Sequence, residues 1–75
     1  MDRNDIWNEI LKERNLQDRQ WGGPEHDDEH NSRDWIIFIV KQLGKASVPW
    51  SEGNFKIRMI KVAALAVAAL EWLYR

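Results

Sequence analysis

The chain has 75 residues, no cysteine and a formal net charge of −1. A domain this short buries only about 60% of its unfolded surface, and without cysteine it has neither disulfides nor thiolate metal sites to reinforce a small core. The first residues are polar and of mixed charge, unlike a secretory signal, so we expect one domain, 1–75, in the cytoplasm.

Charge is unevenly distributed along the chain. Residues 1–34 carry ten acidic and five basic side chains, whereas residues 35–75 carry six basic and two acidic ones. The two halves either neutralise each other in the fold or steer anionic partners to one part of the surface. The overall acidity argues against general DNA binding, because phosphate contacts dominate that affinity.

A first helix is predicted over residues 4–19, where apolar side chains recur at helical spacing. The run Trp21-Gly22-Gly23-Pro24 ends it, because proline cannot continue the helical hydrogen bonds. An acidic connector follows over residues 20–34. Within it, Asn31 or Ser32 can cap the next helix by accepting a hydrogen bond from a free amide.

A second helix is predicted over residues 33–43, closed by Gly44 as a C-terminal cap. Its core, residues 35–40, is continuously apolar with strong β propensity, so periodicity alone does not separate a buried helix from a buried strand. No second segment is strand-like, and a lone strand would have no partner. We therefore predict a helix.

The last helix is predicted over residues 55–74, capped by Asn54. Residues 62–70 are apolar on every side, although too few to span a membrane. A helix apolar all round must be buried all round, which two short helices cannot achieve. We therefore predict an all-α fold: a three-helix protomer with a long apolar C-terminal helix, assembling into a homo-oligomeric helical bundle, a homodimer or larger.

Three segments carry a resemblance to a known family. The pairs Glu13-Arg14, Gln17-Asp18 and Trp21-Gly22 follow one another in order, residues 35–39 open a helix with tryptophan and aliphatics, and residues 59–71 form an alanine- and valine-rich closing helix. Together they resemble the small MazG-like proteins of phage and prophage. The resemblance covers nearly the whole chain and, for a phage protein, implies the cytoplasm of a host cell.

That family implies an oligomeric all-α fold that cleaves nucleoside triphosphates to monophosphate and pyrophosphate with Mg²⁺. The chemistry needs several carboxylates, because Mg²⁺ takes hard oxygen ligands and bridges substrate phosphates. The family places these acids on two facing helices. The matching positions in this sequence carry no carboxylate; they hold Lys41, Gln42, Lys45, Arg58 and Lys61.

The replacement is mostly a reversal of charge. Lys41 and Lys45 share one helical face, as do Arg58 and Lys61. If the family packing holds, the two pairs face each other, repel Mg²⁺ and attract a phosphate directly, with no cofactor. The alternative interpretation is that they are ordinary solvated residues or partners of the acidic connector.

The connector also holds His26, Asp28 and His30, which are weak candidates for metal ligands. A capping or salt-bridging loop, or a general acid/base role for either histidine, explains the same residues.

Five tryptophans divide into two groups. Trp7, Trp35 and Trp72 lie on apolar helical faces and are predicted to be core residues. Trp21 and Trp50 lie in predicted loops, where each either stacks on a nucleobase or covers the core.

The leading hypothesis is therefore non-catalytic binding of a small phosphorylated ligand, for example a nucleotide, in a sequestering or regulatory role. Lys41, Lys45, Arg58 and Lys61 would hold phosphate, and Trp21 or Trp50 the base. One alternative is a divergent Mg²⁺-dependent pyrophosphohydrolase that uses the acids of residues 27–29. Another is a protein-interaction module that acts through the last helix and has no small-molecule ligand.

Overall fold

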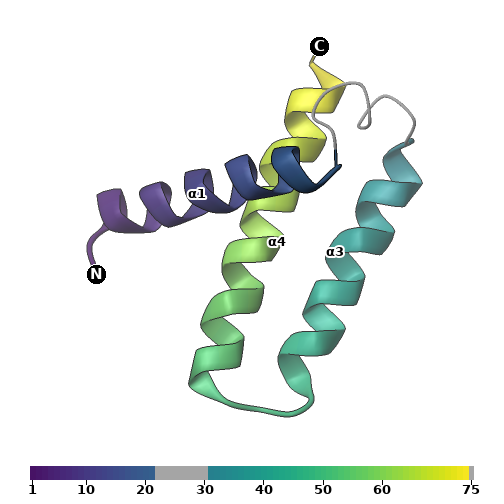
Figure 1. Ribbon diagram of the computed structural model, residues 1–75. Coiled ribbons are helices and arrows are strands. Elements are labelled where there is room, and N and C mark those ends of the chain that lie inside the picture. The colour runs from purple at the N-terminus through teal and green to yellow at the C-terminus, as the bar shows by residue number, and fades with distance from the viewer. Residues whose placement is uncertain (22–30, 75) are drawn as a thin grey trace.

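The computed structural model describes residues 1–21 and 31–74, and these residues are all-helical, as predicted. They form α1 (Arg3–Trp21), α3 (Ser32–Ser47) and α4 (Glu52–Leu73). Helices α3 and α4 make an antiparallel hairpin, and α1 crosses α4 at a steep angle with its N-terminus projecting away from the hairpin (Figure 1). Within the described ranges, no helix is both long and apolar enough to cross a membrane.

The start of α3 confirms one of the two predicted caps. The Asn31 side chain accepts a hydrogen bond from the backbone N–H of Asp34 at 3.1 Å, and the Asp34 carboxylate accepts one from the backbone N–H of Asn31 at 3.2 Å. This reciprocal capping box satisfies two amide donors that have no partner inside the helix.

Two predicted boundaries are wrong. Gly44 does not close α3, which continues to Ser47, and its backbone does not adopt the left-handed conformation of a C-terminal glycine cap. Asn54 does not cap α4. Ser51 takes that role, its hydroxyl accepting from the N–H of Asn54 at 3.0 Å, so that α4 begins at Glu52.

The core lies where α3 meets the C-terminal half of α4. Trp35, Leu65 and Ala68 are buried there, and Trp35 meets Phe38 edge to face at a ring-centroid distance of 5.9 Å. Trp35 is therefore a core residue, as predicted, and Trp72 is partly buried and packs against this cluster. Trp7 is not a core residue: it is 54% exposed, because its part of α1 extends beyond α4.

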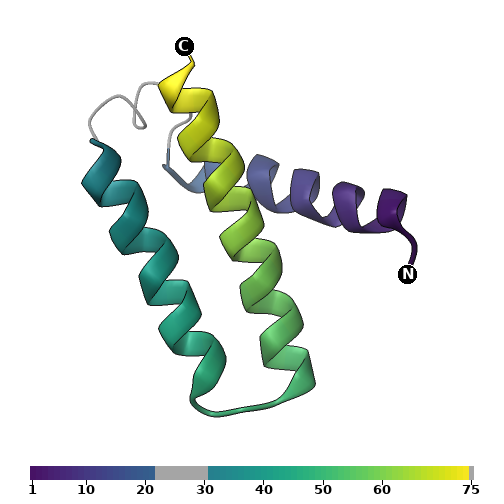
Figure 2. The same cartoon turned by 180° about the vertical axis from the view of Figure 1, so that it is seen from behind.

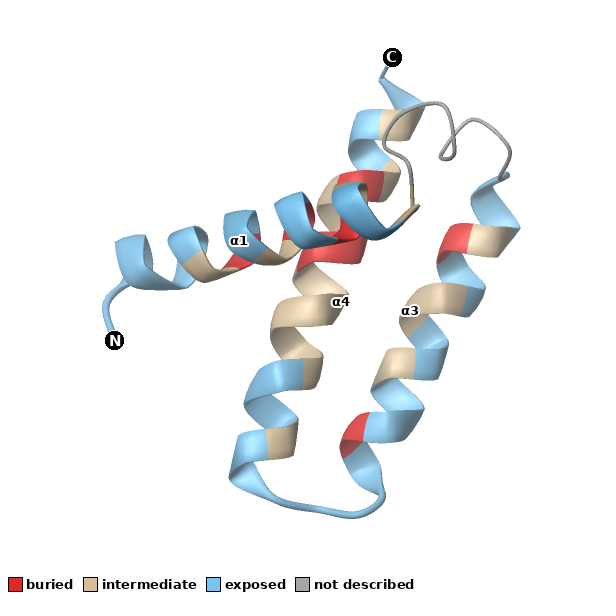
Figure 3. Ribbon diagram, in the orientation of Figure 1, coloured by how far each residue is buried: buried red, intermediate tan, exposed pale blue. Residues whose placement is uncertain are grey.

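A single chain covers α4 only in part. Over residues 62–70 only Ala64, Leu65 and Ala68 are buried, and Leu70 is exposed. The buried positions concentrate around the crossing of α1 and α4, while most of the lower hairpin is half-buried or exposed (Figure 3). From behind, no described helix lies over the hairpin (Figure 2).

Candidate functional site

The hairpin brings two of the five expected metal-site positions into contact. The Arg58 guanidinium donates a hydrogen bond from Nη1 to Oε1 of Gln42 at 3.0 Å, and another from Nε to Oδ1 of Asn54 at 3.3 Å. Arg58 is half-buried, and both acceptors are neutral amide oxygens. Among the described residues no carboxylate pairs with Arg58, so its positive charge is not locally neutralised.

Asn54 fixes the geometry of this end of the hairpin. Its Nδ2 donates to the backbone carbonyl of Lys45 at 2.7 Å and to that of Pro49 at 3.3 Å. The same side chain therefore binds the end of α3, the connecting turn and, through Arg58, the next turn of α4. A chain of neutral hydrogen bonds positions the guanidinium.

The two lysines of α3 are solvent-exposed. Lys41 and Lys45 are four residues apart and share one face of the helix, beside Gln42. Within residues 1–21 and 31–74, no hydrogen bond or ion pair engages either ammonium group. Two unneutralised charges thus lie next to the turn of α3 that contacts Arg58.

Lys61 is directed to α1 instead. Its Nζ lies 2.6 Å from Oε1 of Glu13, whose side chain is only 12% exposed. The charge of Lys61 is therefore offset by a partly buried carboxylate. The four cations do not form one unpaired cluster: Lys61 is paired across helices, Arg58 is held by amides, and Lys41 and Lys45 face solvent.

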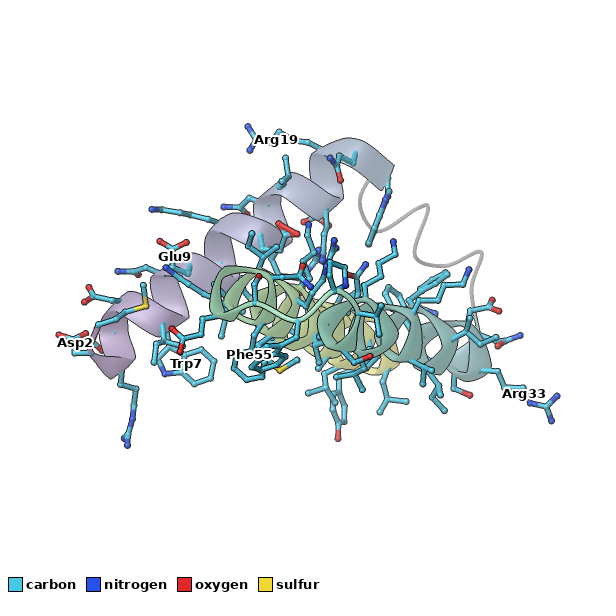
Figure 4. The ribbon with its side chains drawn as sticks, turned by 90° about the horizontal axis from the view of Figure 1, so that it is seen from below. Asp2, Trp7, Glu9, Arg19, Arg33 and Phe55 are labelled. Atoms are coloured by element: carbon cyan, nitrogen blue, oxygen red, sulfur yellow. The ribbon has the colours of Figure 1, made fainter. Side chains whose placement is uncertain are left out.

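A cleft of about 240 Å³ opens between α1 and α4 around this ion pair. Its walls combine Leu16, Ile57 and Ile60 with charged side chains, including Glu9 and Lys12, which lie 3.5 Å apart. Side-chain nitrogens gather in the angle between α1 and the hairpin when the molecule is seen from below (Figure 4). Local spacing gave no signal of this cleft, because it depends on how α1 crosses α4.

Sequence reasoning also missed a buried guanidinium, Arg14, which is 5% exposed. It donates to Glu71 Oε1 at 2.9 Å, to Asp18 Oδ1 at 2.7 Å and to Gln17 Oε1 at 3.4 Å. Burial by itself lowers the pKa of Arg14, but the hydrogen bonds to Glu71 and Asp18 outweigh it and the pKa is raised. The spacing of Arg14 and Asp18 hints at their pairing; Glu71 could not be inferred locally.

The two candidate stacking residues lie at opposite ends of the hairpin. Contrary to the prediction, Trp21 does not lie in a loop: it ends α1 and packs against the core cluster around Trp35 and Leu65. Trp50 lies in the turn before α4, is 66% exposed and contacts the Phe55 ring at a centroid distance of 5.6 Å. Only Trp50 combines an exposed ring with a position near Lys45.

The candidate metal ligands His26, Asp28 and His30 lie outside the described residues, as do the acids of residues 27–29. In the part of the chain that the structure describes, no three histidine, aspartate or glutamate side chains group as they would around a metal ion.

Comparison of the chain with protein-family models, with curated proteins and with solved structures finds no match.

Proposed function

We propose that this chain is a self-associating, MazG-like helical protein that binds a small phosphorylated ligand without hydrolysing it. The observation that carries the proposal is the charge of the hairpin near the turn that joins α3 to α4. Arg58 is half-buried and held only by neutral amides, and Lys41 and Lys45 have no partner among the described residues. An anion bound there would meet three cations that no described carboxylate neutralises.

Phosphate suits these groups chemically. A guanidinium offers planar, paired N–H donors to phosphate oxygens, and lysine ammonium groups add point charges. Arg58 is already oriented by Asn54 and Gln42, so it loses less conformational freedom on binding than a free side chain would. Lys61 would join only by exchanging Glu13 for the ligand. Trp50 is the better candidate for stacking on a base, because Trp21 packs against the core.

Magnesium-dependent hydrolysis at this place is disfavoured by the same residues. Mg²⁺ requires oxygen ligands in octahedral geometry, usually with one or two carboxylates. Here the direct hydrogen bond between Gln42 and Arg58 links the two facing helices, with a cation in one of the expected acid positions.

Self-association is supported by the exposed surface. The chain exposes 5508 Å², whereas the scaling of surface with mass gives about 4,800 Å² for a monomer of 8.9 kDa. The chain therefore exposes more surface than the scaling gives for a monomer of its mass.

The face of the hairpin opposite α1 is the surface that most needs cover. On this face, which we call the hairpin apolar face, apolar side chains recur every three or four residues along α3 and α4, and no charged side chain lies among them. Figure 4 shows mostly carbon side chains on the side of the hairpin to which Phe55 points. The exposed members are Ile36, Leu43, Phe55, Leu70 and Leu73.

Isothermal titration calorimetry against a nucleotide panel without Mg²⁺ tests the ligand. We expect binding that weakens with salt, and a loss of affinity of about tenfold or more in the double variant Lys41→Gln with Lys45→Gln. The matched control, Arg19→Gln with Lys56→Gln, removes the same charge from exposed side chains outside the candidate site and should bind normally.

Absence of binding at millimolar concentration for the whole panel would refute the ligand proposal. Release of pyrophosphate from a triphosphate with Mg²⁺, abolished by Asp28→Ala, would establish the hydrolase alternative instead.

Sedimentation equilibrium tests the assembly. We expect a dimer or larger oligomer that dissociates in Leu70→Glu, which places a charge on the hairpin apolar face, and not in Gln20→Glu, which adds a charge at an exposed position of α1. A protein that stays monomeric at high concentration contradicts the proposed assembly. A stable oligomer without any nucleotide affinity favours the interaction module, which the amount of exposed apolar surface also suits.

A further inference from the structure

The N-terminal arm of α1, residues 3–9, carries an apolar stripe that its own chain leaves uncovered. Ile10 is only 7% exposed, but Ile6 and Trp7, four and three residues before it on the same face, are 45% and 54% exposed. The apolar stripe therefore continues toward the N-terminus of α1 beyond the part of α1 that α4 covers. Figure 1 shows this arm projecting sideways beyond α4.

Trp7 points to a definite side of the molecule. In Figure 4 its ring lies on the same side of α1 as the side to which Phe55 points from α4, whereas Glu9 and Arg19 point to the other side. The arm therefore presents its apolar side toward the layer that contains α4, and its polar side outward. An element lying beside α4 in that layer would be covered by the arm.

The length of the arm fits one helix. At roughly 1.5 Å per residue, residues 3–9 extend about 10 Å, and packed helix axes lie about 8–10 Å apart. The flank of α4 below the arm is suited to such a neighbour. Ile60 lines the cleft under α1, and Ala63 and Val67 follow it at helical spacing, all three half-buried. Small and apolar side chains let a second helix approach closely.

We propose that this neighbour is α4 of a second copy of the chain, so that each copy's α1 arm crosses over the other's α4. A two-fold arrangement covers both arms at once, because the same patch serves on both sides of the interface. This arrangement would bury part of the exposed surface described above. The inference rests on the proposed self-association and adds the contact between the arm and the partner's last helix.

Intermolecular disulfides test the contact directly, because the chain has no cysteine of its own. Trp7→Cys protein is mixed with Val67→Cys protein and oxidised, and the yield of mixed covalent dimer is compared with that from Trp50→Cys and Val67→Cys. A disulfide requires Cα atoms within about 7 Å, so we expect the Trp7 pair to exceed the Trp50 pair at least about fivefold. The Ala63→Cys variant repeats the test one turn away.

Sedimentation equilibrium supplies the energetic readout. Trp7→Ala should raise the dissociation constant of the oligomer about tenfold or more, whereas Val48→Ala, which truncates an apolar side chain that is 78% exposed between α3 and α4, should leave it within about twofold. If the wild type associates but Trp7 neither cross-links to α4 nor affects association, the arm contact is wrong and self-association stands. If the wild type is monomeric at every concentration, both are wrong.

Discussion

Helix α4 packs against its two neighbours by different physics. Against α3 the contact is built from rings and aliphatic side chains, with Trp35, Leu65 and Ala68 buried together. Against α1 it combines apolar side chains, such as Leu16 and Ile60, with two ion pairs across the crossing, Arg14 with Glu71 and Lys61 with Glu13. Helix α4 thus takes part in two contacts, an apolar one with α3 and one with α1 that also contains ion pairs.

The two contacts of α4 have different consequences: apolar burial stabilises the fold, whereas the ion pairs determine where along α4 the helix α1 crosses. Apolar contact is non-directional and scales with the area removed from water, so burial of Trp35, Leu65 and Ala68 contributes to stability without fixing the register of the helices. Ion pairs with partly exposed carboxylates contribute less to the free energy of folding. A guanidinium group, however, donates its hydrogen bonds only in a narrow range of geometries. Arg14 therefore defines where along α4 the first helix crosses. Substitutions at four places in the fold can separate these roles.

Trp35→Ala should have the largest effect, because it removes the centre of the apolar contact. Truncating a buried tryptophan costs about 3–5 kcal/mol, which is comparable with the whole stability expected of a domain this small. We expect the protein to lose its cooperative urea transition, followed by far-UV circular dichroism at a fixed protein concentration. Trp35→Phe keeps a ring and should stay folded; equal loss in both variants would show that the volume of the side chain is not what matters.

Arg14→Ala should destabilise the protein by about 2 kcal/mol. The loss is smaller than for a fully buried ion pair, because Glu71 and Asp18 are about half exposed and can return to solvent. Arg14→Met keeps most of the side-chain volume and should cost less than about 1 kcal/mol while loosening the register of α1. Denaturant titration of both variants measures the difference, with Arg19→Ala, an exposed arginine of the same helix, as the control. Equal costs for Ala and Met would mean that packing dominates even here.

The helices themselves could be predicted from the sequence. Apolar periodicity indicates α1, and the lack of a second strand-like segment decides for a helix over residues 35–40. Their ends could not always be predicted, because two signals compete. Ser51 and Asn54 are both good capping residues, and the structure uses Ser51, which leaves the Asn54 side chain free to bind Lys45 and Pro49 carbonyls. Gly44 favours a helix end, but α3 continues through it to Ser47 and buries Ala46, so tertiary packing overrides the local preference.

The candidate site was predictable only within each helix. Spacing alone placed Lys41 beside Lys45 and Arg58 beside Lys61. The partners that decide their charge lie far away in sequence: Gln42 for Arg58, 16 residues apart, and Glu13 for Lys61, 48 residues apart. These contacts follow from the crossing of three helices, which no local pattern encodes.

The Glu13–Lys61 pair should have a smaller effect, measurable by a double-mutant cycle. Lys61 is about a third exposed, and so we expect a coupling free energy of about 1 kcal/mol or less between Glu13→Gln and Lys61→Met. The coupling should shrink with added salt, whereas the cost of Trp35→Phe should not, because screening acts on charges and not on apolar contact. Control substitutions at Glu9 and Lys12, a more exposed pair 3.5 Å apart, should show weaker coupling still.

Gly44→Ala should give the smallest change and the opposite sign. Gly44 lies within α3, its backbone is not left-handed, and a Cβ atom built there meets nothing within 4 Å. Alanine restricts the unfolded chain more than glycine does, which stabilises an exposed helix interior by roughly 0.5–1 kcal/mol. The gain belongs to the hairpin alone, so the salt-dependent coupling between Glu13 and Lys61 should be unchanged in this background. Thermal unfolding reports the gain. A loss of stability would mean that another chain approaches α3 closely at this glycine and that the methyl group obstructs it, which would extend the proposed interface to the lower end of the hairpin.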